Sequence, residues 1–274
     1  MIRFSSPLAA MLASIVVTAS SDALAIDRYV QVKPPYTRVK LKSSDKLAWT
    51  SAIANDDVGT LTVLLARNDP ATLIPLTMAN GKSALMVAAK KGDQALAEHL
   101  INVGSNVNEI TDTQGTPFMF SVLGGQFGMA RWLLEQGADI NTVGSNGWTA
   151  LTIAAAKGNV PILQWLISQG ADTQVRDVYR FTPLMRAVDN GFLEAAAVLL
   201  SLVETDVNAR DEHDNTALHH AVSAADERIV SLLLEHHADA TIKNRSGITA
   251  YELAEQLSAD SLSIVQLLND AKKR

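Results

Sequence analysis

The chain has 274 residues, of which 47% are apolar, 19% are charged and only 5% are aromatic. This composition is too apolar for a disordered chain, and the low aromatic content favours closely packed helices over a β-sandwich. The net charge of −6 is inconsistent with the basic surface of a nucleic-acid-binding protein, and the absence of cysteine excludes disulfides, thiolate nucleophiles and cysteine-ligated zinc.

The first 25 residues have the features of a secretion signal. A mostly apolar stretch follows Arg3, and Ala23-Leu24-Ala25 has the small-residue pattern of a signal-peptidase site. We therefore predict a signal peptide at 1–25, cleavage after Ala25, and a mature protein that is periplasmic or secreted and not stably inserted in a membrane. The alternative is an amphipathic or uncleaved anchor, although the apolar stretch is short for a membrane-spanning helix.

Residues 26–43 are predicted to form an extended basic leader. The segment contains a proline pair and shows no apolar periodicity. Only one acidic residue accompanies its five basic residues, which are Arg28, Lys33, Arg38, Lys40 and Lys42. We interpret this leader as a solvated arm, and the alternative is a contact with an acidic partner or with lipid.

From about residue 44 onward the sequence repeats itself, and such repeats must be recognised before single elements are assigned. A serine or threonine, followed by Ala or Pro and then by an apolar or aromatic residue, recurs every 33 residues with one step of 34. These hydroxyl residues are Ser83, Thr116, Thr149, Thr182, Thr216 and Thr249, and Leu47 marks an earlier, degenerate copy. The serine or threonine is expected to cap a helix.

Other positions follow the same register, and each has a physical reason. Small residues five positions after the hydroxyl residue, such as Ala88, let neighbouring repeats approach closely. A glycine nine positions after it, such as Gly92, suits the left-handed end of a helix. Pairs such as Leu133-Leu134 place a second helix in a continuous core, and asparagines such as Asn108 recur further on.

This pattern resembles the ankyrin repeat family, whose unit is a β-turn followed by two antiparallel helices. Thr182-Pro183-Leu184 and Thr116-Pro117-Phe118 match the family's helix-start motif best, and His219 is the one histidine in its usual place after that motif. The resemblance implies an all-α fold, an ankyrin-repeat solenoid of helix-turn-helix units with short β-hairpin loops.

The resemblance covers about residues 44–272, in which we predict seven repeats. The first and the last depart from the pattern as capping repeats do, and the last ends in a polar tail from Asn269. The predicted boundaries are 44–79 for the N-terminal cap, then 80–112, 113–145, 146–178, 179–212 and 213–245, and 246–272 for the C-terminal cap.

The sequence shows no catalytic constellation, so we predict a protein that is not an enzyme and needs no cofactor. A nucleophile elbow and a phosphate-binding loop are both absent. The glycine-rich stretch from Gly124 to Gly128 falls where an inter-helix turn is expected. Five histidines lie in one repeat, but the adjacent His219 and His220 face different directions on a helix, so no metal site is predicted. A metal-dependent enzyme that uses this repeat is the least favoured alternative.

Members of this family usually meet their partners through the hairpin tips and the exposed side of the first helices. By register, the candidate residues lie just before each hydroxyl residue and seven or eight positions after it. Two neighbouring repeats concentrate aromatic residues there, which are typical interface anchors, although Trp148 could instead pack on its own hairpin. The candidate protein-binding residues are Trp148, Lys157, Tyr179, Phe181, Asp189, Asn190, Lys90 and Lys91.

We therefore expect a monomeric, non-catalytic protein–protein interaction module that is exported to the periplasm and binds a partner protein through its concave face and hairpin tips. Nucleic acid is not expected as a partner. The alternative is an exported effector that binds host proteins. The same repeats would serve both functions, so only the destination of the protein separates them.

Overall fold

The computed structural model describes residues 41–257 and 262–271. The predicted signal peptide, its cleavage site after Ala25 and residues 26–40 of the basic leader lie outside these ranges. Within them every regular element is a helix, and the only strand-like pairing is an isolated bridge between Lys243 and Thr249. The all-α fold is confirmed. No helix in the described ranges is long and apolar enough to cross a membrane.

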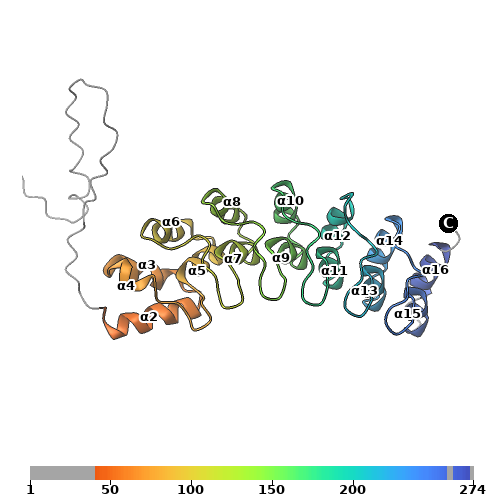
Figure 1. Cartoon of the computed structure of the whole chain (residues 1–274), viewed down its shortest axis with the longest axis horizontal. Helices are drawn as coiled ribbons and strands as arrows, with labels where there is room; N and C mark the ends of the chain where they lie inside the picture. The colour runs from red at the N-terminus through yellow and green to blue at the C-terminus, as the bar shows by residue number, and fades with distance from the viewer. Residues whose placement is uncertain (1–40, 258–261, 272–274) are drawn as a thin grey trace, which may run out of the picture. The chain divides into compact units, whose positions relative to one another are not determined.

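The helices follow one another as antiparallel pairs (Figure 1). The first segment contains α2 (Ser43–Ala54), α3 (Val58–Arg67) and a short α4 (Pro70–Leu73). The pairs after it are α5 (Ala84–Lys91) with α6 (Gln94–Asn102), α7 (Pro117–Leu123) with α8 (Phe127–Glu135), α9 (Ala150–Ala156) with α10 (Val160–Ser168), α11 (Pro183–Asp189) with α12 (Leu193–Leu200), α13 (Ala217–Ser223) with α14 (Glu227–Glu235), and α15 (Ala250–Gln256) with α16 (Leu262–Ala271). The first helices of the pairs form one layer and the second helices form another (Figure 1).

The two ends of the repeat array differ from the sequence prediction. The leader was expected to run to residue 43, but Ser43 already belongs to α2, and Leu47 lies inside that helix with 71% of its surface exposed. Because the side chain of leucine cannot cap a helix, Leu47 does not mark the helix start. α2 begins earlier, after Lys42, whose side chain makes no capping hydrogen bond. At the other end α16 continues through Asn269 to Ala271, so the predicted polar tail begins as helix.

The recurring hydroxyl residues cap the first helix of each pair, as predicted. Their side-chain oxygen accepts the N–H three residues ahead in five pairs, at Ser83, Thr116, Thr149, Thr182 and Thr249. At Thr216 the imidazole of His219 also takes part, because its Nδ1 accepts the Thr216 N–H at 3.2 Å. Each such cap contributes about 1 kcal/mol to stability, so the repeated threonines define where the helices begin.

The core is continuous along the stack. The small residues five positions after each cap, including Ala88, Ser121 and Ala154, are fully buried. The first leucine of each recurring pair is also buried, whereas the second is half-buried in most pairs. No pair of helices could cover these apolar surfaces alone, so neighbouring repeats stabilise each other.

Backbone hydrogen bonds join the loops that connect one helix pair to the next. Each hairpin loop closes on itself, as where the Asp211 N–H donates to the Asn215 carbonyl at 2.9 Å. Neighbouring hairpin loops are also linked, as where the Glu212 N–H donates to the Tyr179 carbonyl at 3.0 Å. The β-hairpin loops are therefore present, but each is too short for a strand. The hairpin loops form a row with fixed spacing.

The recurring asparagines tie the far ends of the second helices together. The Asn108 side chain donates to the Gly137 carbonyl at 2.9 Å and accepts the Asp139 N–H at 3.0 Å.

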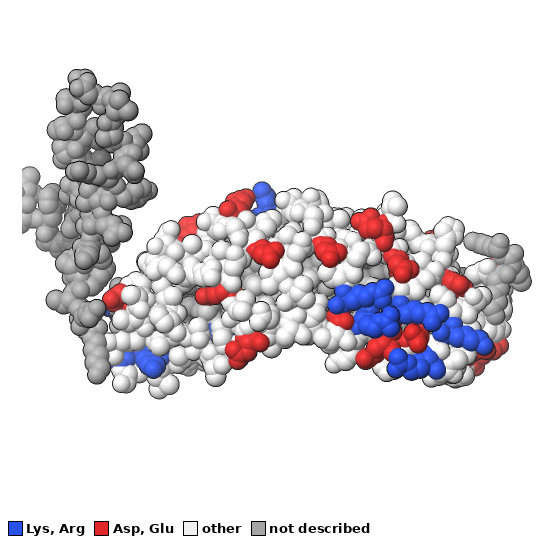
Figure 2. Space-filling model, viewed as in Figure 1, with Lys and Arg blue, Asp and Glu red and all other residues white. Residues whose placement is uncertain are grey.

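The charged side chains are distributed unevenly over the surface. Figure 2 shows acidic side chains scattered over the visible face, while lysines and arginines gather over the last repeats.

Candidate protein-binding face

The candidate residues lie on one face, which we call the first-helix face. It consists of the exposed sides of α5, α7, α9, α11 and α13 and the hairpin loops before them. Tyr179 is 52% exposed, whereas Trp148 and Phe181 are half-buried. Lys90 is half-buried. The other candidates are exposed, and these are Lys91, Lys157, Asp189 and Asn190.

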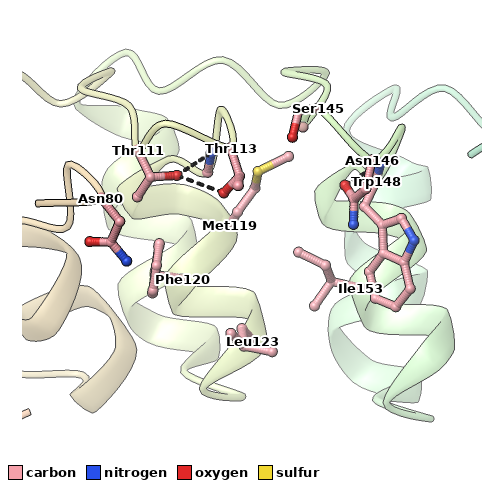
Figure 3. A pocket seen from close by; sticks show the side chains of 12 residues that line it. Asn80, Thr111, Thr113, Met119, Phe120, Leu123, Ser145, Asn146, Trp148 and Ile153 are labelled. Atoms are coloured by element: carbon pink, nitrogen blue, oxygen red, sulfur yellow. Dashed lines mark hydrogen bonds between the residues drawn. The ribbon is translucent and has the colours of Figure 1, made fainter. Parts of the chain in front are cut away.

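An apolar pocket of about 450 Å³ opens on this face between α7 and α9. Met119 and Ile153 extend toward one another from the two helices, and Trp148 closes one side (Figure 3). Phe120 and the 40%-exposed Leu123 complete the apolar lining. The rim is polar and consists of Asn80, Thr111, Thr113, Ser145 and Asn146. An apolar pocket with a polar rim can take a side chain of a partner protein.

The hairpin loop before α9, which lines the pocket, lacks a side chain that the neighbouring loops carry. Five positions before the cap, Thr111, Asp177 and Asp211 each use a side-chain oxygen to accept backbone N–H groups of their own loop. Gly144 occupies this position in the loop before α9, where Asn146 accepts the Trp148 N–H instead. A Cβ at Gly144 would lie 3.0 Å from Asn146 Oδ1 and 3.3 Å from the Trp148 carbonyl oxygen, so the loop is closely packed at this point.

Arg186 connects the aromatic candidates. Its guanidinium carbon lies 4.2 Å from the centroid of the Phe181 ring and 5.2 Å from the Trp148 ring. Asp177 holds the guanidinium in place, since the Arg186 Nε–H donates to Asp177 Oδ2 at 2.8 Å. The two aromatic residues therefore share one cation across neighbouring repeats, which stiffens this part of the face.

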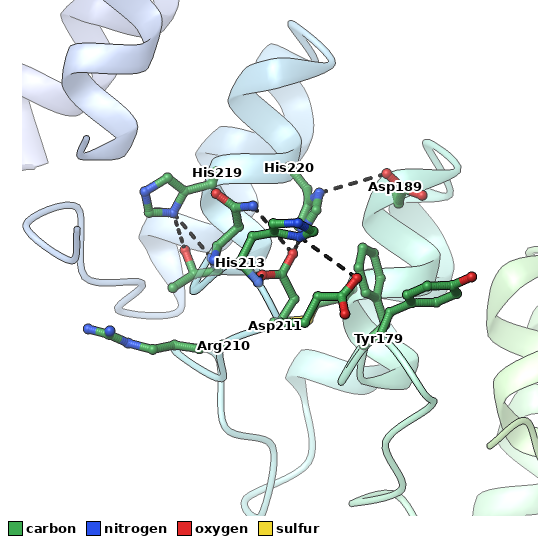
Figure 4. A network of polar contacts seen from close by, with 12 residues as sticks. Tyr179, Asp189, Arg210, Asp211, His213, His219 and His220 are labelled. Carbon is green, nitrogen blue, oxygen red and sulfur yellow. Dashed lines mark hydrogen bonds and ion pairs between the residues drawn. The ribbon is translucent and has the colours of Figure 1, made fainter. Parts of the chain in front are cut away.

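His220 extends the same row into the next repeat (Figure 4). Its ring lies 4.8 Å from the Phe181 ring, and its Nε2 lies 3.0 Å from Asp211 Oδ2. Asp189, a candidate residue, faces its Nδ1 at 3.8 Å. The first-helix face thus combines the apolar pocket with a row of alternating aromatic and charged groups.

The carboxylate of Asp211 is fully buried behind this row. Its Oδ1 accepts the N–H groups of His213 and Asn215 at 2.7 and 2.9 Å. Burial alone raises the pKa of Asp211, but these backbone N–H groups and the His220 side chain outweigh it and leave the pKa below its ordinary value. A carboxyl with a lowered pKa in the folded state stabilises the fold above the pKa of the unfolded chain, and this contribution is lost as the pH falls through the folded value.

Asp211→Asn is expected to lower the free energy of unfolding at pH 7 by about 1–2 kcal/mol, because asparagine keeps an acceptor oxygen but loses the charge. The difference from wild type should shrink as the pH falls below about 4, the ordinary pKa of the carboxyl, and vanish below the lowered folded pKa, where the wild-type carboxylate also loses its charge. Urea unfolding of wild type and variant, at pH 7 and at pH values below 4, measures the difference in unfolding free energy. Asp112→Asn, at an exposed position of another hairpin loop, is the control and should change little. An equal loss of unfolding free energy at all these pH values would show that the charge of Asp211 does not stabilise the fold.

The N-terminal candidate Lys90 is engaged within the chain. Its ammonium lies 2.6 Å from Asp56 Oδ2, and the Lys82 ammonium lies 2.5 Å from Asp56 Oδ1. Burial alone raises the pKa of Asp56, but both lysines outweigh it and hold the pKa below its ordinary value. Asp56 has φ 53°, at the register position where four other repeats carry glycine. Lys90 is therefore less available to a partner than the exposed Lys91.

The side chains of His219 and His220 have partners within the chain. The Nε2–H of His219 donates to the Ile248 carbonyl at 3.2 Å, and burial lowers the pKa of this histidine, which favours a neutral ring. His236 ends α14, and His237 follows it with φ 63°. Among the described residues, no group of three or more His, Asp or Glu side chains is placed to hold a metal ion.

Sequence reasoning missed the residues that organise the face. Arg186 and His220 lie four positions after their caps, where the two preceding pairs carry Phe120 and Ile153. The residue type at this position changes from apolar to basic, and an aspartate lies nine residues before each basic residue. This was a signal available in the sequence. The glycine at position 144, where the neighbouring loops carry a side chain, was a second signal.

Comparison with known proteins agrees with the repeat pattern. A family model described as ankyrin repeats in three copies matches residues 49–144 and 141–211, and a second, described as ankyrin repeats in many copies, matches residues 202–254. The ankyrin repeat domain of human ASB11 superposes with a TM-score of 0.68 at 22% identity, covering 84% of this chain and 98% of that one. This likeness shows the fold.

Sequence relatives share only part of their length with this chain. The BTB/POZ domain and ankyrin repeat-containing protein NOOT2 of Medicago truncatula is 35% identical over 77 residues, which are 28% of this chain and 16% of that protein. The nuclear factor NF-kappa-B p105 subunit of Gallus gallus is 36% identical over 95 residues, which are 34% of this chain and 9% of that protein. The match is confined to a fraction of each relative.

Proposed function

Because the chain belongs to the ankyrin repeat family and is therefore a protein–protein interaction module, we propose that it is a non-catalytic protein that binds its partner through the first-helix face. The observation that carries this proposal is the apolar pocket between α7 and α9, continued by the row of Trp148, Arg186 and Phe181. Desolvated apolar and aromatic anchors supply most of the free energy of protein association.

The proposed mode of binding places an apolar side chain of the partner against Met119 and Ile153. The exposed Tyr179 and Leu123 would flank it, and the charged residues beyond them would set its orientation. Because hydrogen bonds fix the hairpin loops relative to one another, little conformational entropy would be lost when the partner binds.

The proposed site of action is the periplasm, after export and cleavage behind Ala25. The support for it is the sequence of the first 25 residues, with its short apolar stretch and its Ala-Leu-Ala pattern. The partner would accordingly be a protein of that compartment.

Site-specific photo-cross-linking in cells that express the full chain tests the proposal. A benzoyl-phenylalanine in place of Leu123 puts the probe at the pocket, and one in place of Val63, an exposed apolar residue of α3, is the matched control. We expect a partner protein, identified by mass spectrometry, to be cross-linked in the periplasmic fraction from position 123 and not from position 63. Cross-links from position 63 alone would place the binding surface elsewhere.

A further inference from the structure

A second surface, on the side of the hairpin loops that points away from the first helices, carries a row of largely uncompensated positive charges. It consists of Arg176, Arg210 and Lys243, which we call the basic stripe. Each lies six residues before the capping threonine of its repeat, on the first arm of a hairpin loop. The two preceding loops carry the exposed apolar residues Ile110 and Val143 at this position. The charge is therefore a property of the last three hairpin loops.

The stripe lies on the side of the hairpin loops away from the first helices. Asp177 and Asp211, the next residues in the chain, contact Arg186 and His220 on the first-helix face. Successive side chains of an extended segment point to opposite faces, so Arg176 and Arg210 point away from that face. In agreement, Arg176 borders a small hollow with Leu199 and Thr205.

The charges of the stripe are exposed and largely uncompensated. Among the described residues no carboxylate lies within 4.0 Å of Arg176 or Lys243, and Arg210 reaches only Asp214, at 4.0 Å. Asp214 is shared with the neighbouring Arg245, also at 4.0 Å. Figure 2 shows a cluster of lysines and arginines over the last repeats, with acidic side chains beside it. In a chain with a net charge of −6, this basic surface stands out.

The spacing of the stripe is fixed by the fold. The Arg176 guanidinium donates to the Arg210 carbonyl at 3.1 Å, across two hairpin loops. The loop of Lys243 is joined to the preceding one, because the Arg245 N–H donates to the His213 carbonyl at 2.9 Å. One positive charge per repeat is thus held in a row, which favours an extended ligand with regularly placed negative charges.

We propose that the basic stripe binds an acidic, extended segment of a partner protein, rich in Asp and Glu. The carboxylates of Glu212 and Asp214 lie among the basic residues, and they would repel the continuous charge of a nucleic acid. A peptide can place its acidic residues opposite the arginines and leave neutral residues opposite these carboxylates. This goes beyond the proposed function, since the stripe would contact a different part of the partner from the pocket.

The test uses a fluorescent ten-residue peptide of alternating glutamate and glycine and the full chain, with fluorescence anisotropy as the measurement. The variant Arg176→Gln, Arg210→Gln, Lys243→Gln is compared with a control of equal charge change, Arg67→Gln, Arg131→Gln, Arg228→Gln, which alters exposed arginines of second helices. We expect the stripe variant to bind the peptide about tenfold more weakly than the control at low ionic strength, and the difference to fall as salt is added.

Equal binding of the peptide by the stripe variant and the control would overturn the proposal. So would tighter binding of oligothymidylate, or of phosphatidylglycerol vesicles, than of the peptide to the wild-type chain, because the stripe would then favour another class of anion. Neither outcome bears on the pocket, because Leu123 and Trp148 are unchanged in both variants.

Discussion

Gly124→Ala is expected to lower the free energy of unfolding by about 3 kcal/mol, the upper part of the range for overpacking. A Cβ at Gly124 would lie 2.0 Å from the carbonyl oxygen of Lys90 and 2.9 Å from its carbonyl carbon. The obstacle is backbone of the neighbouring helix α5, which cannot rotate away as a side chain could. The end of α7 would have to separate from α5. Urea unfolding of the full chain measures the loss.

Gly128→Ala is the matched control, four residues further along the chain. No atom lies within 4 Å of a Cβ at Gly128, and the residue belongs to α8. Alanine favours a helix over glycine by up to about 1 kcal/mol, so this variant should be unchanged or slightly more stable. If both alanine variants unfolded at the same urea concentration, the close contact between α5 and α7 would be refuted.

These two glycines show where prediction from the sequence ends. The stretch from Gly124 to Gly128 was predicted as the turn between two helices. The turn covers its first part, where Gly125 has a left-handed φ of 70°, whereas Gly128 already belongs to α8. The register also indicated the caps, the buried alanines and the leucines, because each follows from a local rule that recurs in every repeat. The contact of Gly124 with Lys90 does not follow from any local rule, since it depends on how closely two particular helices approach.

The candidate site was likewise predicted only in part from the sequence. The register placed Trp148, Tyr179 and Phe181 on the first-helix face, because position in the repeat determines the face. It did not indicate that Arg186 lies between two of the three aromatic rings, or that a pocket opens between α7 and α9. The contact of Arg186 with Trp148 and the pocket both join residues of neighbouring repeats, so they depend on how the repeats pack against one another.

Combined replacement of Trp148, Tyr179 and Phe181 by alanine is expected to weaken partner binding by at least about 2 kcal/mol, roughly thirtyfold in Kd. The change removes one wall of the pocket and both rings that hold Arg186, together with the exposed Tyr179 ring. The matched control is Phe127→Ala, Trp132→Ala, Trp165→Ala, which removes aromatic rings of similar size from second helices. Circular dichroism establishes that both variants remain folded.

Isothermal titration calorimetry tests most directly whether the first-helix face is the binding surface. The partner identified by cross-linking is purified and titrated into the wild-type chain and into both triple variants. We predict that the Trp148, Tyr179 and Phe181 variant loses at least about thirtyfold in affinity, while the control variant stays within a few fold of wild type. Wild-type affinity in the first variant, or an equal loss in the control, would contradict the assignment of partner binding to this face.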